Sequence, residues 1–146
     1  MIIYLDSDFE GNSYNGFSFD EGFFLSIVQA AAEEGVDFSD AAELSLVLST
    51  DEFIRKLNLD FRGLDAPTDV LSFPQEDDEL LGDIVISLET AERKAVEIGC
   101  PLREEAAFLF IHGLLHLKGY DHSSEKEEAE MFSLQERCLK RWRDKQ

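Results

Sequence analysis

Three histidines, all that the chain contains, lie in the stretch HGLLHLKGYDH, residues 112–122. His112 and His116 are four residues apart, a spacing that puts two side chains on one face of a helix. Gly119 is expected to end that helix, and the turn after it can bring His122 back as a third ligand. Three neutral imidazoles favour zinc and leave a fourth position open, as in catalytic zinc sites. The sequence therefore predicts one Zn²⁺ ion held by His112, His116 and His122.

A structural zinc site is the alternative interpretation of this cluster. Such sites usually have four protein ligands, often cysteines. Neither Cys100 nor Cys138 is near the histidines in sequence, although either can approach them in the fold. Because the two cysteines also lack a C-x-x-C partner, we expect free thiols rather than a disulfide.

Gly113 distinguishes this motif from that of a peptidase. The metzincin peptidases share the spacing H-x3-H-x2-G-x2-H but have a glutamate after the first histidine. With glycine in that place the general base is absent, and peptide hydrolysis is not expected. Three neutral ligands also leave the +2 charge of zinc uncompensated, which suits an anionic substrate such as a phosphodiester.

Acidic residues dominate the composition, with a net charge of −19 over 146 residues. Residues 1–54 contain twelve acidic residues and no lysine or arginine. A field of this sign argues against non-specific binding to nucleic acid, although it permits a local basic groove. No apolar run approaches the roughly 18–20 residues that span a bilayer, and the N-terminus lacks the basic region of a signal peptide. We therefore expect a cytoplasmic protein with no membrane partner.

The elements that must position the histidines follow from hydrophobic periodicity and from helix start and stop signals. Strands are predicted over residues 1–6, 42–49, 68–73 and 82–87, and helices over residues 20–34, 50–59, 88–98, 102–118 and 124–143. The acidic segment 74–82 is predicted as a loop or hairpin connection. This order indicates an α+β domain. The helix over 102–118 is apolar enough to be largely buried, and it carries two of the histidines.

Local signals refine the helix ends and the inner faces. Ser49 with Glu52 and Ser124 with Glu127 have the spacing of capping boxes. Met131 invites comparison with the metzincin Met-turn, but its helical spacing favours a place in the core.

Arg62 is the candidate for substrate binding, in the segment LNLDFRGLDAPTDVLSFP, residues 57–74. A planar guanidinium matches phosphate bidentately, while a surface arginine beside a turn fits the sequence equally well. Asp121 is a candidate for orienting a ligand histidine, or else for capping its turn. Asp69 and Asp83 are interpreted as turn or cap residues.

Three stretches together resemble the YbeY family of bacterial endoribonucleases, which act as rRNA maturation factors. They are residues 57–74, LGDIVIS at residues 81–87 and HGLLHLKGYDH, and they occur in the family's order. The third matches the family signature in full, including Gly113, whereas the first third of the chain fits only in length and element order. One departure is Leu64, because the family often has a lysine after the Arg-Gly pair.

This resemblance implies a zincin-like α+β fold in a single domain, residues 1–146. The fold has a small mixed sheet, about five helices and the metal-site helix near the C-terminus. The implied activity is zinc-dependent, single-strand-specific cleavage of RNA in 16S rRNA 3′-end processing and ribosome quality control. Its partners would be rRNA and ribosome-associated proteins, and no DNA is expected. Arg62 and His116 are the implied catalytic residues, and Arg62 with Lys118 would bind the substrate.

Several alternatives remain open in the sequence. The phosphodiester can be attacked by metal-activated water or by the 2′-hydroxyl of the RNA itself. A non-catalytic ribosome-assembly factor with a structural zinc is a rival function, as is a peptidase-like metallohydrolase with an unusual base. A cationic cluster near the C-terminus can contact RNA, but it fits better as charges that stabilise a helix end: Arg137, Lys140, Arg141, Arg143 and Lys145.

Overall fold

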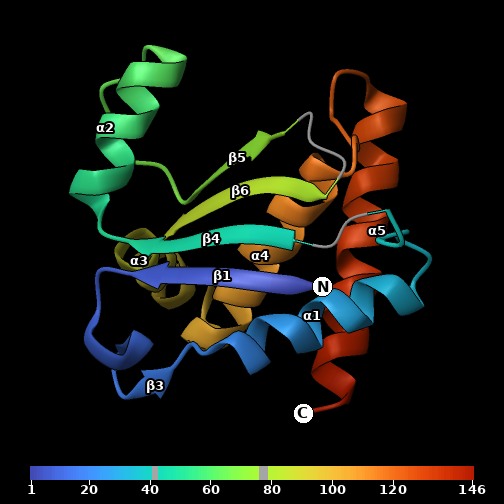
Figure 1. Cartoon of the computed structure of the whole chain (residues 1–146), viewed down its shortest axis with the longest axis horizontal. Helices are drawn as coiled ribbons and strands as arrows, with labels where there is room; N and C mark the ends of the chain where they lie inside the picture. The colour runs from blue at the N-terminus through green and yellow to red at the C-terminus, as the bar shows by residue number, and fades with distance from the viewer. Residues whose placement is uncertain (41–42, 76–78) are drawn as a thin grey trace.

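The computed structural model describes residues 1–40, 43–75 and 79–146. In these residues four strands form one sheet in the order β1-β4-β6-β5 (Figure 1). β1 (Ile2–Ser7), β4 (Glu43–Ser49) and β6 (Leu80–Ser87) are parallel, and β5 (Val70–Pro74) pairs with β6 in antiparallel fashion. The predicted mixed sheet is confirmed, although residue 42 of one predicted strand and residues 76–78 of the predicted connection lie outside the described residues.

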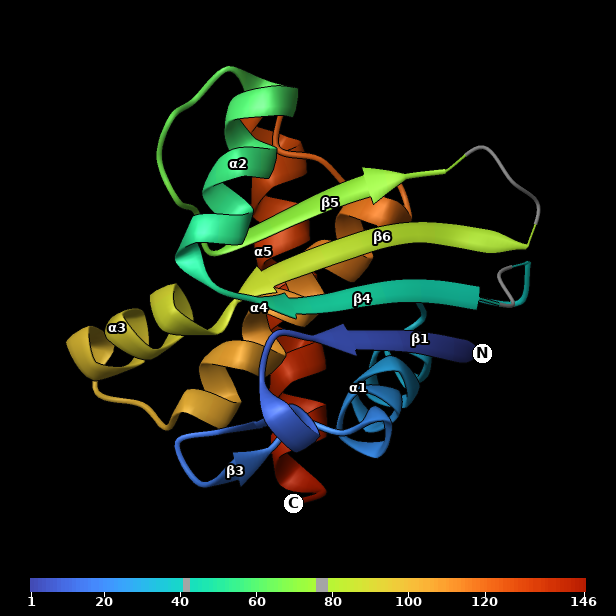
Figure 2. The same cartoon turned by 60° about the vertical axis from the view of Figure 1, so that its left-hand side comes forward.

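Five α-helices complete the described part of the chain: α1 (Glu21–Glu33), α2 (Asp51–Arg62), α3 (Leu88–Ile98), α4 (Leu102–Leu117) and α5 (Glu125–Asp144). Figure 2 shows α1, α4 and α5 behind the sheet. The predicted α+β class, the helix count and the position of the metal-site helix are therefore confirmed. No helix among the described residues is long and apolar enough to cross a membrane.

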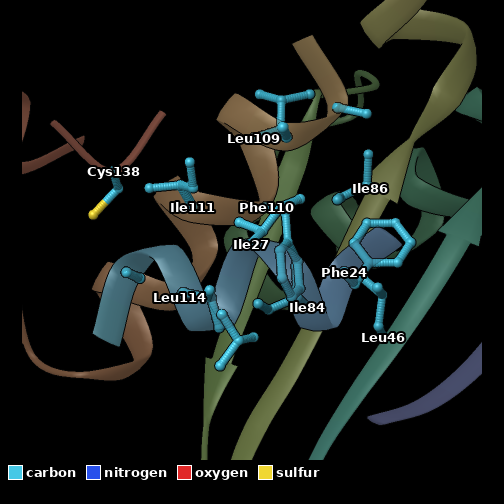
Figure 3. Close-up of a cluster of buried hydrophobic side chains, with 14 of the residues drawn as sticks. Phe24, Ile27, Leu46, Ile84, Ile86, Leu109, Phe110, Ile111, Leu114 and Cys138 are labelled. Carbon is cyan, nitrogen blue, oxygen red and sulfur yellow. The ribbon is translucent and has the colours of Figure 1, made fainter. Parts of the chain in front are cut away.

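The larger core lies between the sheet and the layer formed by α1, α4 and α5. Alternate residues of the strands, such as Leu46, Ile84 and Ile86, point into it and meet Phe24 of α1 and Phe110 of α4 (Figure 3). Strand residues alternate between the two faces of a sheet, so the same strands present their other residues to the opposite side. α4 lies in this layer against the sheet, and most of its residues are therefore buried.

A smaller cluster forms on the opposite face of the sheet under α2. Ile54 of α2 packs there with Leu71 of β5 and Val85 of β6, and all three side chains are buried. Phe61 near the end of α2 also meets Phe73 of β5, with ring centroids 5.1 Å apart. These contacts hold α2, and with it Arg62, against the β5 edge of the sheet.

The start and the end of α2 correct the sequence prediction. The cap is Thr50, whose hydroxyl accepts a hydrogen bond from the Phe53 amide at 3.3 Å. Ser49 cannot cap the helix because it belongs to β4, where its buried hydroxyl donates to the carbonyl of Ile86. The helix also continues three residues beyond the predicted position 59 and ends at Gly63, whose φ of 71° suits glycine. Arg62 is thus the last residue of a helix.

A short hairpin between β1 and α1 was missed in the sequence. β2 (Ser13–Tyr14) and β3 (Phe17–Ser18) pair in antiparallel fashion through Asn15 and Gly16, which both have positive φ. Asn-Gly is the strongest short signal for such a turn, but strands of two residues are too short to show an alternating pattern.

The interpretation of Asp83 as a turn or cap residue is wrong, because it lies inside β6 and pairs with Phe73 of β5. Three other local predictions are confirmed. The hydroxyl of Ser124 accepts from the amide of Glu127 and caps α5. Met131 is buried in the core. Cys100 and Cys138 are free thiols, and burial raises the pKa of the Cys138 thiol to about 11.

A polar cluster around Asp51 joins the starts of α2 and α3. The Asp51 carboxylate accepts hydrogen bonds from the hydroxyls of Ser87 and Thr90 and from the guanidinium of Arg93, at 2.7, 2.5 and 2.7 Å. Burial raises the pKa of this carboxyl, but the three hydrogen bonds outweigh it and hold the pKa below its ordinary value. The cluster therefore favours the ionised form of Asp51 in the folded protein.

Candidate metal centre

α4 places His112 and His116 one turn apart on the same face. Their Nε2 atoms lie 3.1 Å apart, and their ring centroids are 4.5 Å apart. Two nitrogens that share a tetrahedral zinc ion at 2.0–2.1 Å are separated by about 3.3 Å. The spacing of the two imidazoles therefore fits a common metal ion.

The end of α4 brings His122 to the same point. Gly119, with a φ of 93°, follows the last turn, and the Tyr120 amide donates to the carbonyl of Leu115 at 3.0 Å. This C-terminal turn reverses the chain. His122 then faces His116 with ring centroids 4.9 Å apart, and one ligand atom from each of the three histidines lies within 4.8 Å of the others. An all-imidazole set with this geometry fits a zinc ion with an open coordination position.

Gln135 of α5 orients the first ligand. Its Oε1 lies 3.4 Å from Nδ1 of His112 and accepts the proton there, which leaves Nε2 free to face the metal position. The Gln135 side chain is only 4% exposed, so this contact is fixed in the protein interior. The sequence prediction missed it. The signal was a polar residue on the predicted inner face of the last helix, four residues after Met131.

The environment keeps the two helical histidines neutral. Burial lowers the pKa of the His112 imidazole, although the hydrogen bond to Gln135 partly opposes this effect. Burial and the neighbouring His112 lower the pKa of His116 in the same direction. Neutral rings present the lone pairs that a metal ion requires.

Gly113 faces away from the histidines and into the core. A Cβ atom at this position would lie 3.0 to 3.2 Å from three carbon atoms of the Ile84 side chain on β6. α4 therefore approaches the sheet so closely at this point that any side chain at position 113 would require Ile84 to shift. A glutamate at position 113 would point into the apolar core, and the absence of the peptidase base follows from how this helix packs.

Arg62 lies in the same open cavity as the metal ligands. This cavity of about 600 Å³ is lined by all three histidines, by Arg62 and by Asp69. Arg62 has no acidic partner within 4 Å among residues 1–40, 43–75 and 79–146, unlike most of the cations in that part of the chain. The side chain of Asn58 donates to the carbonyl of Ala66 at 2.8 Å and fixes the loop that follows Arg62. The exposed Arg62 side chain thus lines the same cavity as the histidines and is accessible to an anion there.

Two other candidate residues, Lys118 and Asp121, already have partners within the protein. Lys118 does not line the cavity, and its amine pairs with Asp40 at 3.1 Å. The Asp121 carboxylate accepts from the amide of His122 at 2.7 Å and lies 3.9 Å from Nδ1 of that ring. It caps the turn that carries the third ligand. The roles predicted for Lys118 in substrate binding and for Asp121 in orienting a ligand stay predictions.

The C-terminal cations are neutralised by acidic neighbours. Arg137 and Arg141 pair with Glu34, Lys145 pairs with Glu33, and α5 separates them from the metal centre along its length. Arg143 and Lys140 pair with Glu104 and Asp144. The Lys140–Asp144 pair lies within α5, and the other pairs join α5 to the end of α1 and to α4. The cluster is therefore better explained by helix packing than by RNA binding.

Fold and site together define a small α+β protein with three histidines that could hold a metal ion at the end of a buried helix. The family model described as Endoribonuclease YbeY matches residues 14–143. The chain is 43% identical to Endoribonuclease YbeY of Heliobacterium modesticaldum, with 96% of this chain and 95% of that protein covered, and 40% identical to that of Bacillus velezensis, with 95% of each covered. The solution structure of TM1509 from Thermotoga maritima is similar at a TM-score of 0.68 and 29% identity, with 97% and 89% of the two chains covered.

The chain therefore belongs to the endoribonuclease YbeY family. This confirms the resemblance found in the sequence and the predicted enzyme class. The match reaches back to residue 14, so the family also accounts for most of the N-terminal third, where the sequence carried no recognisable motif.

Proposed function

We propose that this protein is a zinc-dependent endoribonuclease that cleaves single-stranded RNA by hydrolysis of a phosphodiester bond. The observation that carries the proposal is the convergence of the three histidines on the wall of an open cavity that also contains Arg62, which has no acidic partner within 4 Å among the described residues. Family membership supports the cleavage of RNA. The all-nitrogen ligand set supports zinc over magnesium or calcium, which prefer oxygen ligands.

The charges of the cavity support an anionic substrate. Arg62 is opposed there by Asp69 and Asp121, so a divalent ion among the neutral histidines makes the cavity net positive. This local field explains how a chain of net charge −19 can accept a phosphodiester.

Arg62 orients the substrate and stabilises the transition state. Its guanidinium donates hydrogen bonds to non-bridging phosphate oxygens and neutralises the charge that develops on them. When bound, a zinc ion supplies Lewis-acid polarisation and makes water acidic enough to ionise near neutral pH. Gln135 holds the proton on Nδ1 of His112 and keeps that ring in the metal-binding tautomer.

In the cell we propose that the protein acts in the cytoplasm on rRNA, in 16S 3′-end processing and ribosome quality control. Ribosome-associated proteins would be its partners. The support is family membership, together with a histidine signature that matches the family in full.

The direct experiment is cleavage of a single-stranded RNA from the 3′ region of 16S rRNA, with zinc measured in the same protein sample. His116→Ala and His122→Ala are the control variants, and His122 is useful because its side chain is 44% exposed and lies outside the core. We expect both variants to lose zinc and cleavage together. A variant that loses zinc but cleaves at the wild-type rate would refute a catalytic role for the metal and favour the assembly-factor alternative.

The ends of the products distinguish the two chemical routes. Attack by water leaves no cyclic phosphate, whereas attack by the 2′-hydroxyl gives a 2′,3′-cyclic phosphate. We expect linear ends, and a cyclic product would overturn the hydrolytic route while leaving endonuclease activity intact.

A further inference from the structure

A second cavity of about 530 Å³ adjoins the metal centre on the side away from Arg62. It lies between the start of β5 and helices α3, α4 and α5. His112, His122, Asp69 and Val70 line both cavities and form the wall between them. The volume is within the roughly 300–1,000 Å³ of small-molecule sites. A substrate held at the metal can therefore extend into this second cavity without leaving the protein surface.

Apolar surface predominates in the lining of the second cavity. Phe108 and Leu109 of α4 face Met131 and Phe132 of α5 across it. Phe132 is 60% exposed, whereas the other large apolar side chains of α5, such as Met131 and Trp142, are buried. A partly exposed aromatic ring beside an apolar cavity is a stacking surface for a planar ligand.

The charged residues of this cavity exclude a phosphate. Glu125 and Glu128 of α5 line it, and the amine of Lys94 is paired with the Asp69 carboxylate at 2.9 Å. The lining thus has an acidic excess, and its lysine is already neutralised by Asp69. The Arg62 cavity instead contains a cation that has no acidic partner in the described part of the chain. A nucleotide that bridges the two cavities is oriented by this contrast, with its phosphate toward Arg62 and its neutral base in the second cavity.

We infer that the second cavity binds one unpaired nucleobase of the RNA, next to the scissile phosphate, with Phe132 as its stacking partner. This inference rests on the proposed function and adds that the protein binds a nucleobase of the RNA as well as its phosphate. A base inside the cavity cannot pair with a second strand at the same time. The cavity therefore supplies a physical reason for single-strand specificity, since a duplex would first have to open.

The test compares intact and abasic RNA. A single-stranded 16S 3′-region oligonucleotide and a series of copies, each with one abasic position, are bound to the zinc-loaded protein, with affinity measured by fluorescence anisotropy in the cold. Cleavage rates are measured in parallel. Because stacking on an aromatic ring is lost with the base, we expect roughly 10-fold weaker binding for one abasic position adjacent to the cleavage site.

Phe132→Ala should remove this discrimination. In that variant the intact and the abasic RNA should bind equally, while zinc content and the melting temperature stay near wild type. Phe53→Ala is the matched control, because Phe53 is also exposed on a helix but lines neither cavity, and it should keep the 10-fold difference.

Failure of the inference differs from failure of the proposed function. If Phe132→Ala keeps the wild-type ratio between intact and abasic RNA, or if no abasic position matters in the wild-type protein, the base site is refuted even when cleavage is normal. If the ratio behaves as expected but no RNA is cleaved, the base site stands and the proposed catalytic function is refuted.

Discussion

The Asp51 cluster and the histidine cluster are both polar groups placed where helices meet the sheet, but they differ in how their polar atoms are satisfied. Around Asp51, the carboxylate receives hydrogen bonds from Ser87, Thr90 and Arg93. Around the metal centre, His112 and His116 direct their Nε2 atoms toward each other, and His122 completes the group. One cluster is complete within the protein, and the other has the arrangement that a metal ion would complete.

This difference teaches which polar clusters serve stability and which serve function. A partly buried carboxylate that accepts hydrogen bonds from several donors, like that of Asp51, stabilises the fold. A set of neutral nitrogens brought together in an open cavity gains little from folding alone and is instead prepared to bind. The predictions below challenge that contrast, starting with the largest expected effect.

Removal of one metal ligand should abolish activity with little loss of stability in the metal-free protein. We expect His112→Ala to lower kcat/KM for RNA by at least about 1000-fold, because metal catalysis contributes several kcal/mol. The free energy of unfolding of the metal-stripped variant should stay within about 2 kcal/mol of the metal-stripped wild type. Steady-state cleavage and urea unfolding measure the two effects, and a large loss of metal-free stability would contradict the contrast.

A buried carboxylate with no hydrogen-bond partner should destabilise the fold, in contrast to the hydrogen-bonded carboxylate of Asp51. Gly113→Glu places a charge against Ile84 in the core, and we expect a loss of more than about 3 kcal/mol of stability and no gain of peptidase activity. Urea unfolding and a casein assay check this. The smaller Gly113→Ala change is the control, with a milder loss caused by the close contact of its Cβ atom with Ile84.

Loss of the unpaired cation should weaken catalysis without affecting the fold. We expect Arg62→Ala to lower kcat/KM by about 100-fold, in the range found when one charge-stabilising donor is removed. Zinc content and the melting temperature should stay unchanged. Lys56→Ala on the same helix is the matched control, since Lys56 does not line the cavity. Equal effects of the two variants would indicate general electrostatic attraction instead of a specific contact.

Weakening the hydrogen-bonded cluster around Asp51 should lower the stability of the fold and leave RNA cleavage unchanged. Asp51→Asn removes the charge that holds Arg93, and we expect a loss of about 2 kcal/mol at pH 7 with near-normal cleavage. The folded-state pKa of Asp51 lies below its ordinary value of 3.8, so its contribution is present above that pH and is lost as the pH falls through the folded pKa. The stability difference between wild type and variant should therefore shrink below pH 4. A difference that persists there would mean that packing, not charge, is responsible.

Much of this architecture could be predicted because each local signal was unambiguous. The spacing of His112 and His116 and the stop at Gly119 specified the metal centre, and these depend only on helix geometry. The boundaries of α3, α4 and α5 were within one residue of the observed ones for the same reason.

The rest depends on tertiary contacts that no local pattern records. Gln135 becomes a partner of His112 only because α5 packs beside α4. Serine is a common helix cap, but Ser49 is the last residue of β4 and pairs there with Ser87 of the neighbouring strand β6. The meaning of Gly113 likewise appeared only when α4 was placed against Ile84.

The most direct test of the central claim is a zinc titration of the metal-stripped wild-type protein, with RNA cleavage measured at each step. The account predicts no cleavage without metal and a rise that stops at one zinc ion per chain, with no rise in the His116→Ala variant. Full cleavage by protein that contains no zinc, or binding of one zinc ion without any gain in cleavage, would contradict it.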